Sequence, residues 1–251
     1  MELKGKTAFV TGGSGDVGGA IARTLATAGA DVALSYVGYQ EGATAVVKAV
    51  QAAGRRSLAV QLDQCDAAAI DAAVARVVGA FGRVDILVNN AAWNIGIPFT
   101  NLDALTAEIW DRVLATNLRG PYLLARAFAP HLRQHGAGRI VNIASLGGLY
   151  PASSSIAYSA SKAGLIHLTR CLAVALAPDV TVNCIAPGLV EGSRMAQRLP
   201  EEIVQLARSQ VVLGRTASIQ DIAEQVVTFC RAESITGQVL VIDGGMPAGM
   251  H

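Results

Sequence analysis

The chain has 251 residues, of which 52% are hydrophobic and only 16% are charged, and its formal net charge is +1. This composition favours a folded protein with a large apolar core and argues against disorder. The low charge without a long basic run predicts no nucleic-acid partner, and no apolar run is long enough to cross a membrane.

The chain begins with a strand-like segment and shows no apolar stretch typical of a signal peptide, so we expect a cytoplasmic protein. Its four cysteines are widely spaced and form no CxxC pair, a pattern typical of buried thiols in a reducing compartment. The histidines show no metal-ligand spacing. We therefore predict no metal site.

Short β-branched runs alternate with segments that carry apolar residues at helical spacing. The runs predict strands at residues 7–10, 32–35, 57–62, 86–89, 139–144, 180–185 and 238–242. The intervening segments predict helices at residues 18–28, 44–53, 67–81, 106–119, 157–177 and 219–231. This alternation predicts an α/β, Rossmann-like, doubly wound fold: one domain over residues 1–251, with a seven-stranded parallel sheet and helices on both faces. Its ligand crevice should lie at the carboxyl ends of the strands.

A glycine-rich turn follows the first predicted strand and reads Thr11-Gly12-Gly13-Ser14-Gly15-Asp16-Val17-Gly18. Glycines between a strand and a helix let backbone amides approach a pyrophosphate, which the helix amino terminus stabilises. The GxGxxG match alone is weak, because glycine turns also occur without a ligand. In its strand–turn–helix context, the turn predicts a dinucleotide site.

The end of the second predicted strand, residues 35–38, contains no carboxylate. A carboxylate at this place would bind the adenosine ribose 2′-hydroxyl and repel a 2′-phosphate, and Asp31 lies at the opposite end of the strand. Its absence favours NADP(H). No Arg or Lys follows closely in the sequence to neutralise the phosphate, so NAD(H) remains the alternative.

Tyr158 and Lys162 lie four residues apart in a predicted helix, and Ser145 ends an apolar run upstream. Side chains at this spacing share a helix face. A neighbouring ammonium should lower the phenol pKa from about 10 towards neutrality and so create a general acid/base. The alternative is an exposed helix that carries Tyr and Lys by chance.

These motifs, taken together along nearly the whole chain, resemble the short-chain dehydrogenase/reductase superfamily, in particular its 3-oxoacyl reductase and glucose dehydrogenase-like members. The resemblance rests on an ordered set: Thr11 to Gly18, Asp63, Asn89-Asn90-Ala91-Ala92, Asn117, Ser145, Tyr158 with Lys162, Pro187-Gly188, Thr236-Gly237-Gln238 and Asp243-Gly244-Gly245.

The resemblance implies a catalytic tetrad of Asn117, Ser145, Tyr158 and Lys162. Tyr158 would exchange a proton with the substrate oxygen, which Ser145 would hold and polarise. Lys162 would lower the Tyr158 pKa and bind the nicotinamide ribose. Asn117 would position a water that links Lys162 to solvent.

The resemblance also implies the cofactor-binding residues. Asp63 would accept a hydrogen bond from adenine, with a strand-end cap as its alternative role, and Asn90 would lie beside the adenosine ribose. Ser193 would replace the threonine that the family places near the nicotinamide carboxamide. The full predicted set is Gly12, Ser14, Gly15, Asp16, Val17, Gly18, Tyr36, Asp63, Gln64, Asn90, Ala91, Tyr158, Lys162, Pro187, Gly188, Val190 and Ser193.

Asp16 departs from the family pattern, because it occupies the place of the usual middle glycine. Aspartate tolerates a positive φ if the position requires one. A carboxylate beside a pyrophosphate would weaken cofactor binding unless it points away.

The resemblance predicts an NAD(P)(H)-dependent enzyme that interconverts a secondary alcohol and a ketone, working as a homotetramer or homodimer. A 3-oxoacyl thioester is the first substrate class, and a sugar or polyol is the alternative. A catalytically silent binding protein on the same fold is the competing class. We expect Trp93 and Tyr150 near the substrate, with plain packing of their rings as the alternative, and a helix at residues 200–208 as a lid. Arg194 and Arg198 are expected at the surface, with contact to an anionic substrate as the alternative.

Overall fold

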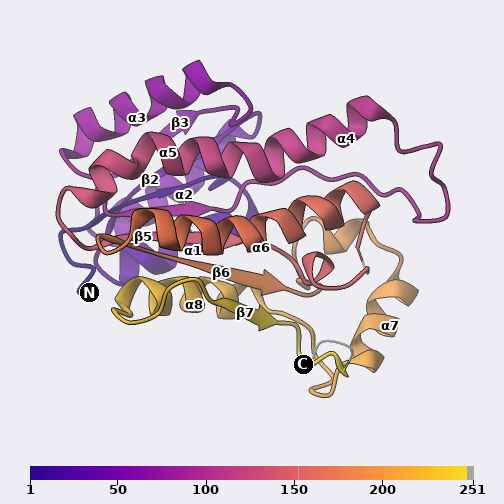
Figure 1. Ribbon diagram of the computed structural model, residues 1–251. Helices are drawn as coiled ribbons and strands as arrows, with labels where there is room; N and C mark the ends of the chain where they lie inside the picture. Colours follow the sequence, from indigo (N-terminus) through magenta and orange to yellow (C-terminus); the bar gives the residue numbers. More distant parts are fainter. Residues whose placement is uncertain (152, 248–251) are drawn as a thin grey trace.

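Over the described residues, 1–151 and 153–247, the computed structural model contains one seven-stranded parallel sheet with helices on both faces (Figure 1). The predicted α/β doubly wound architecture is confirmed. The strands are β1 (Thr7–Val10), β2 (Asp31–Tyr36), β3 (Ser57–Gln61), β4 (Ile86–Asn89), β5 (Gly138–Ile143), β6 (Val180–Pro187) and β7 (Val239–Ile242).

The strand order is β3-β2-β1-β4-β5-β6-β7, and every neighbouring pair is parallel. The order reverses between β1 and β4, because the chain winds outward from β1 in one direction and from β4 in the other. In such sheets a crevice opens at the carboxyl ends of the two strands at this switch point. The fold therefore sets the place of a ligand site before any side chain is considered.

The helices form two layers, one on each face of the sheet (Figure 1). One layer holds α1 (Asp16–Thr27), α2 (Gln40–Ala52) and α8 (Ile219–Arg231), and the other holds α3 (Ala67–Phe81), α5 (Gly120–Arg133) and α6 (Ile156–Leu176). Successive residues of β1 serve the two cores alternately. Val10 packs in the core beneath α1, whereas Phe9 packs in the other core, 5.0 Å from Phe128 between ring centroids.

The segment predicted as one helix at 106–119 is α4 (Ala107–Leu114) followed by a π-helical turn, η1 (Ala115–Arg119). No separate helix was predicted after it, yet the chain continues directly into α5. Pro121, which has no N–H to donate to the preceding turn, is the second residue after the π-helical turn. A short 3₁₀ turn, η2 (Leu146–Gly148), follows β5. A second one, η3 (Ala196–Arg198), precedes α7 (Glu201–Gln210), which is the predicted lid helix.

Among the described residues, no helix combines the length and the apolar character needed to cross a membrane.

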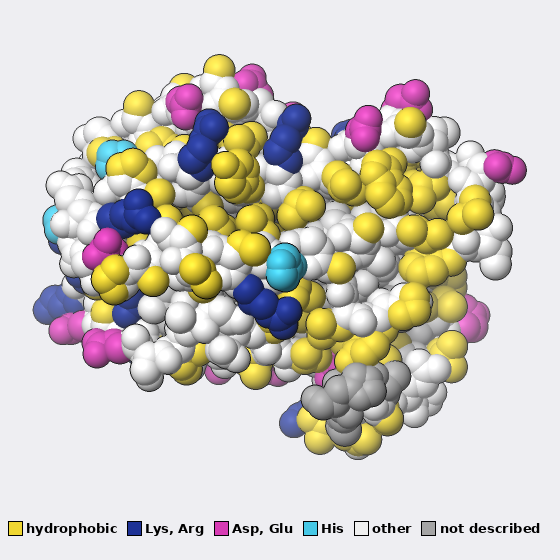
Figure 2. All heavy atoms as spheres, in the orientation of Figure 1, with side chains coloured by type: hydrophobic (Ala, Val, Ile, Leu, Met, Phe, Trp, Pro, Cys, Tyr) yellow, Lys and Arg dark blue, Asp and Glu magenta, His cyan; other side chains and the backbone are white. Residues whose placement is uncertain are grey.

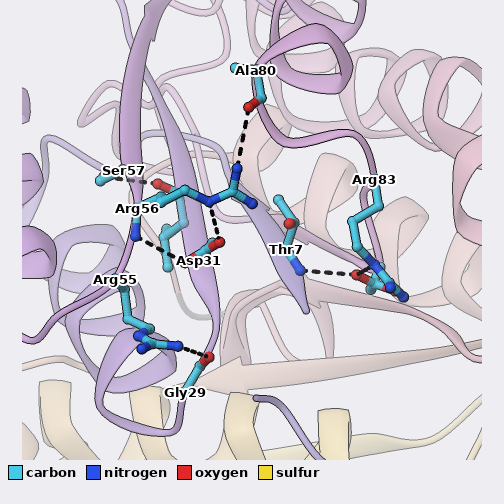
Figure 3. A network of polar contacts seen from close by, with 10 residues as sticks. Thr7, Gly29, Asp31, Arg55, Arg56, Ser57, Ala80 and Arg83 are labelled. Atoms are coloured by element: carbon cyan, nitrogen blue, oxygen red, sulfur yellow. Dashed lines mark hydrogen bonds and ion pairs between the residues drawn. The ribbon is translucent and has the colours of Figure 1, made fainter. Parts of the chain in front are cut away.

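A network of ion pairs stabilises the amino-terminal edge of the sheet, opposite the crevice (Figure 3). The buried Asp85 carboxylate accepts hydrogen bonds from the Thr7 backbone amide at 2.9 Å and from Arg83 at 2.5 and 2.8 Å. A second pair, Asp31 with Arg56, lies nearer the solvent, where the Arg56 side chain is 59% exposed. The Asp85 pair is the more buried of the two, since the side chains of Asp85 and Arg83 are 3% and 29% exposed and those of Asp31 and Arg56 are 14% and 59% exposed.

The Asp85→Asn substitution should lower the free energy of unfolding by about 2 kcal/mol or more, because it leaves buried donors without their charged acceptor. Asp31→Asn is the matched control and should cost under about 1 kcal/mol, as expected for an exposed pair. Urea unfolding of both variants measures the difference. Equal losses would contradict the structural weight given to Asp85.

Candidate active site

A cleft of about 1940 Å³ opens at the carboxyl edge of the sheet. Its walls come from the glycine-rich turn, the loops after β2, β3, β4, β5 and β6, and helices α6 and α7. All of the predicted cofactor-binding residues line it, as do Ser145, Tyr158 and Lys162. The structure thus brings these separate sequence motifs to one place.

The glycine-rich turn depends on close packing against its own helix. Gly12 has φ +63°, a left-handed conformation that favours glycine. A Cβ atom on Gly18 would lie 2.4 Å from the Gly12 carbonyl oxygen and 2.6 Å from the Asn90 amide nitrogen. Gly15 precedes α1 and offers no side-chain cap, so the first amides of α1 have no capping acceptor. This arrangement suits an anionic ligand such as a pyrophosphate.

Hydrogen bonds join the turn after β1 to the turn after β4. The Thr11 hydroxyl accepts from the backbone amides of Asn90 and Ala91, both at 2.9 Å. The Asn90 side-chain amide donates to the Thr11 carbonyl at 2.8 Å. Asn90 therefore shapes the floor of the cleft, whatever further contact it makes with a ribose.

Asp16 is the first residue of α1, and no non-glycine residue in the described chain has a positive φ. The position therefore does not require the left-handed conformation. Its carboxylate accepts a hydrogen bond from the Arg194 backbone amide at 2.7 Å and also contacts the Arg194 Nε at 3.4 Å. This engagement partly neutralises a charge that would otherwise oppose a phosphate.

Residues after β3 form the end of the cleft at which the sequence predicts the adenosine. The buried Gln64 side chain donates to the carbonyls of Ala91 at 3.2 Å and Thr116 at 2.7 Å, which fixes the wall. One oxygen of Asp63 accepts from the Cys65 amide at 2.9 Å, as the strand-end cap alternative requires. Asp63 and Gln64 both line the cleft, so the hydrogen bond to Cys65 leaves Asp63 accessible from the cleft.

Ser145, Tyr158 and Lys162 converge where β5 ends and α6 begins. The Ser145 hydroxyl is hydrogen-bonded to the Tyr158 phenol and also accepts from the Gly147 amide at 3.1 Å. The Lys162 ammonium donates to the Ile143 carbonyl at 2.8 Å and lies 5.6 Å from the centroid of the Tyr158 ring. A hydroxyl, a phenol and an ammonium therefore meet beside the glycine-rich turn.

The pKa of Tyr158 moves in the direction opposite to the one expected from the pair. Burial raises the pKa of Tyr158 to about 12, although its hydrogen bond to Ser145 acts in the other direction. Burial also lowers the pKa of Lys162 to about 8. Desolvation of two buried groups outweighs their mutual attraction here, because the Lys162 ammonium is bound to a carbonyl rather than to the phenol oxygen. At neutral pH, Tyr158 is therefore a protonated phenol.

Asn117 is fully buried in the π-helical turn and does not line the cleft. Its side-chain oxygen accepts from the Trp93 amide at 2.8 Å, and its side-chain nitrogen donates to the Trp93 carbonyl at 2.9 Å and to Ser161 at 3.2 Å. The Ser161 hydroxyl donates in turn to the Tyr158 carbonyl at 2.7 Å. The side chain thus positions the Trp93 loop against α6, and its predicted role with water stays a prediction.

The turn after β6 uses its polar groups internally. The Ser193 hydroxyl donates to the Val190 carbonyl at 2.7 Å and accepts from the Ala196 amide at 3.2 Å. Gly188 packs closely against Asp243, because a Cβ atom added to Gly188 would lie only 2.9 Å from the Cβ atom of Asp243. Ser193 is therefore committed to the loop, which leaves its predicted carboxamide contact a prediction.

Several apolar side chains line the outer part of the cleft, beside polar ones such as Asn94 and Ser154. Trp93 lines it and stacks beneath Arg112, whose guanidinium lies 4.1 Å from the ring centroid. Ile203 and Leu206 of α7 also line the cleft, and both are about half exposed. Figure 2 shows hydrophobic side chains running down the side of the molecule that carries α4 and α7. Tyr150, expected beside Trp93, is not among the lining residues.

An ion pair fixes α7 to the loop after β6. Glu191 accepts hydrogen bonds from Arg208 of α7 and, at 2.8 Å, from the Thr216 hydroxyl. The hydrogen bonds from Arg208 lower the pKa of Glu191 to about 2. The sequence placed the helix but not its anchor, since Glu191 and Arg208 carry no motif.

The contacts of Arg194 are the second feature that the sequence missed. Its side chain is exposed, as expected, but it also lies across the glycine-rich turn beside Asp16 and Ser14. The only signal was the unusual carboxylate at Asp16, which calls for a cation nearby.

The cleft suits a dinucleotide better than a metal. A left-handed glycine, a close helix–turn contact and an uncapped helix start together leave room and donors for a pyrophosphate. The described residues contain no group of three or more His, Cys, Asp or Glu side chains placed to hold a metal ion.

Comparison with known proteins gives a consistent result. A family model described as enoyl-(acyl carrier protein) reductase matches residues 14–247. The 3-oxoacyl-(acyl-carrier-protein) reductase FabG of Staphylococcus aureus is 38% identical over 245 residues, which are 96% of this chain and 98% of that protein. The structure is also similar to a short-chain dehydrogenase from Burkholderia cenocepacia in complex with NADP, with a TM-score of 0.90, 39% identity, and 98% and 100% of the two chains covered. An NAD⁺-bound xylitol dehydrogenase gives a TM-score of 0.91 at 28% identity, with the same coverage.

The chain belongs to the short-chain dehydrogenase/reductase family. It is an NAD(P)-dependent oxidoreductase that acts on alcohol or keto groups, and the catalytically silent alternative is set aside.

The Gly18→Ala substitution should abolish measurable dinucleotide binding, because its Cβ would collide with the Gly12 carbonyl and force the turn apart. Gly79→Ala in α3 is the matched control, since a Cβ there meets nothing within 4 Å. That variant should bind normally and gain about 0.5–1 kcal/mol of stability, the usual advantage of alanine over glycine in a helix. Quenching of protein fluorescence by NADPH measures binding. Unchanged affinity in Gly18→Ala would refute the account of the turn.

Proposed function

We propose that this protein reduces the ketone of a 3-oxoacyl thioester to a secondary alcohol with NADP(H), using Tyr158 as the general acid. The observation that carries the proposal is the meeting of Ser145, Tyr158 and Lys162 in the same cleft as the uncapped amino terminus of α1. A proton donor and a phosphate cradle facing one cleft are what hydride transfer to a carbonyl requires.

The bound nicotinamide cofactor supplies the hydride for the carbon atom of the carbonyl. The protein then has to hold the carbonyl oxygen and give it a proton. Ser145 donates a hydrogen bond to that oxygen and polarises it. Tyr158 transfers its proton to the same oxygen, because the raised phenol pKa keeps this proton in place at neutral pH.

Lys162 stabilises the site after the proton has left. With a pKa of about 8, its ammonium remains largely charged at neutral pH and lies close to the ring that becomes a phenolate. A neighbouring cation favours the phenolate over the phenol. Asn117 acts as a positioning residue, through its hydrogen bonds to Trp93 and Ser161.

NADP(H) is the favoured cofactor. Tyr36 at the end of β2 and the residues Val37 and Gly38 after it present no carboxylate to the cleft. The Burkholderia cenocepacia relative is described in complex with NADP, and its likeness covers nearly the whole of both chains.

The apolar side chains of the outer cleft support the substrate class. Trp93, Ile203 and Leu206 offer surfaces suited to an acyl chain, and FabG of Staphylococcus aureus carries the matching activity in its name. The alternative is a sugar or polyol, which the resemblance to xylitol dehydrogenase favours. Such a substrate needs several polar partners, and Asn94, Ser153 and Ser154 of the cleft lining could supply them, so the comparison of substrates below decides between the two classes.

We further propose that residues 1–251 act as one cofactor-binding domain and that the enzyme is a cytoplasmic homotetramer or homodimer. The free cysteines of the described chain support a reducing location. Size-exclusion chromatography with light scattering decides the oligomeric state.

The Tyr158→Phe variant should lose at least about a hundredfold in kcat for 3-oxoacyl thioester reduction, since a positioned proton donor contributes about that much. Its affinity for NADPH should stay within about twofold of the wild type, because the ring remains. Absorbance at 340 nm follows turnover, with NADH, sugars and polyols as comparison substrates.

Tyr150→Phe, which removes a phenol outside the cleft lining, is the matched control and should retain wild-type activity. Substantial turnover by Tyr158→Phe would remove this residue from its role. Preferred oxidation of polyols by the wild type would replace the thioester assignment with the alternative.

A further inference from the structure

Arg194 is a cation close to the end of β2, where the neighbouring sequence contains no Arg or Lys to neutralise the 2′-phosphate of NADP(H). It belongs to the loop after β6, yet it contacts the glycine-rich turn 178 positions earlier in the chain. Its Nη2 atom donates to the Ser14 carbonyl at 3.4 Å and would lie 3.3 Å from a Cβ atom on Gly15. Arg194 thus takes the space beside the turn that a side chain at position 15 would otherwise occupy.

The guanidinium also reaches the turn after β2. It stacks on Tyr39 with 4.9 Å from its Cζ atom to the ring centroid. Tyr39 precedes α2, and the first turn of α2 has no side-chain cap. The ring fits because residue 42 is glycine, since a Cβ there would lie 2.1 Å from the ring. Arg194 therefore bridges the glycine-rich turn and the start of α2.

Arg194 retains the capacity to bind a ligand. Its side chain is 49% exposed and lines the cleft. The two side-chain hydrogen bonds that it makes are both 3.4 Å long, and they use two of its five N–H donors. The shorter bond to Asp16, at 2.7 Å, comes from the Arg194 backbone amide, so it anchors the loop without occupying the guanidinium.

The place between these two turns is where the adenosine ribose of a dinucleotide lies, at the end of β2. The 2′-phosphate distinguishes NADP(H) from NAD(H) at this ribose. A guanidinium binds phosphate through paired hydrogen bonds, and an uncapped helix start adds further donors.

We propose that Arg194 is the residue that selects NADP(H), by binding the 2′-phosphate from the loop after β6, and that Asp16 positions it through its backbone amide. This inference rests on the proposed function, because it presumes a dinucleotide in the cleft. It also explains the carboxylate at position 16, which holds the selecting loop in place.

Two other charged side chains lie on α2 near this place. Lys48 lines a small neighbouring hollow together with Gly38, Tyr39 and Glu41, outside the main cleft. Lys48 is therefore the competing cation, and Glu41 partly offsets it. Substitution of Lys48 provides a control that removes the same charge beside the same turn.

The test compares binding of four probes by isothermal titration calorimetry: NADPH, NADH, adenosine 2′,5′-bisphosphate and 5′-AMP. The variants are Arg194→Gln, Arg194→Lys and Lys48→Gln. Arg194→Gln should weaken NADPH and the bisphosphate by about tenfold or more, as expected for a lost charged hydrogen-bond pair, and leave NADH and 5′-AMP within about twofold. Arg194→Lys should recover part of the loss, and Lys48→Gln should match the wild type.

Equal weakening of NADH and NADPH by Arg194→Gln would show a purely structural role for the loop and overturn the proposal. Wild-type discrimination in that variant, or its loss in Lys48→Gln, would overturn it as well. Each of these results leaves the proposed function standing, provided that the wild type binds NADPH. Failure of the wild type to bind either nucleotide would instead refute the proposed function.

Discussion

The junction between β1 and β4 is the constraint on which the site depends. Strand order reverses there, so the loops after the two strands diverge and leave a crevice. Bonds between Thr11 and Asn90 hold the two strand ends together beneath it. The close contact of Gly18 with Gly12 then aims the start of α1 at the same space. Glycine is needed at position 18 because the junction leaves no volume for a larger residue.

Burial determines the chemistry at the other end of the cleft. Tyr158 and Lys162 are both removed from water, and desolvation shifts each pKa towards the neutral form. The phenol therefore holds its proton at neutral pH, which suits a donor to a carbonyl oxygen. Ser145 is hydrogen-bonded to the same phenol, which keeps the proposed proton donor beside the hydroxyl proposed to bind the substrate oxygen.

The sequence predicted the sheet well, because buried parallel strands are β-branched runs that few helices imitate. It missed α5, for which no separate helix was predicted between residues 119 and 139. The lining of the cleft followed from family motifs, but the direction of the Tyr158 pKa shift did not, because sequence spacing does not report burial. Arg194 could not be placed from sequence, since its contacts with Asp16 and Tyr39 arise only when distant loops meet.

A crystal structure with NADP⁺ tests the central claim most directly. The account predicts a dinucleotide extended along the cleft, with its pyrophosphate at the start of α1, its adenine beside Asp63, and its nicotinamide next to Tyr158 and Lys162. Density for the dinucleotide outside this cleft, or a nicotinamide ring remote from the Tyr158 phenol, would contradict it.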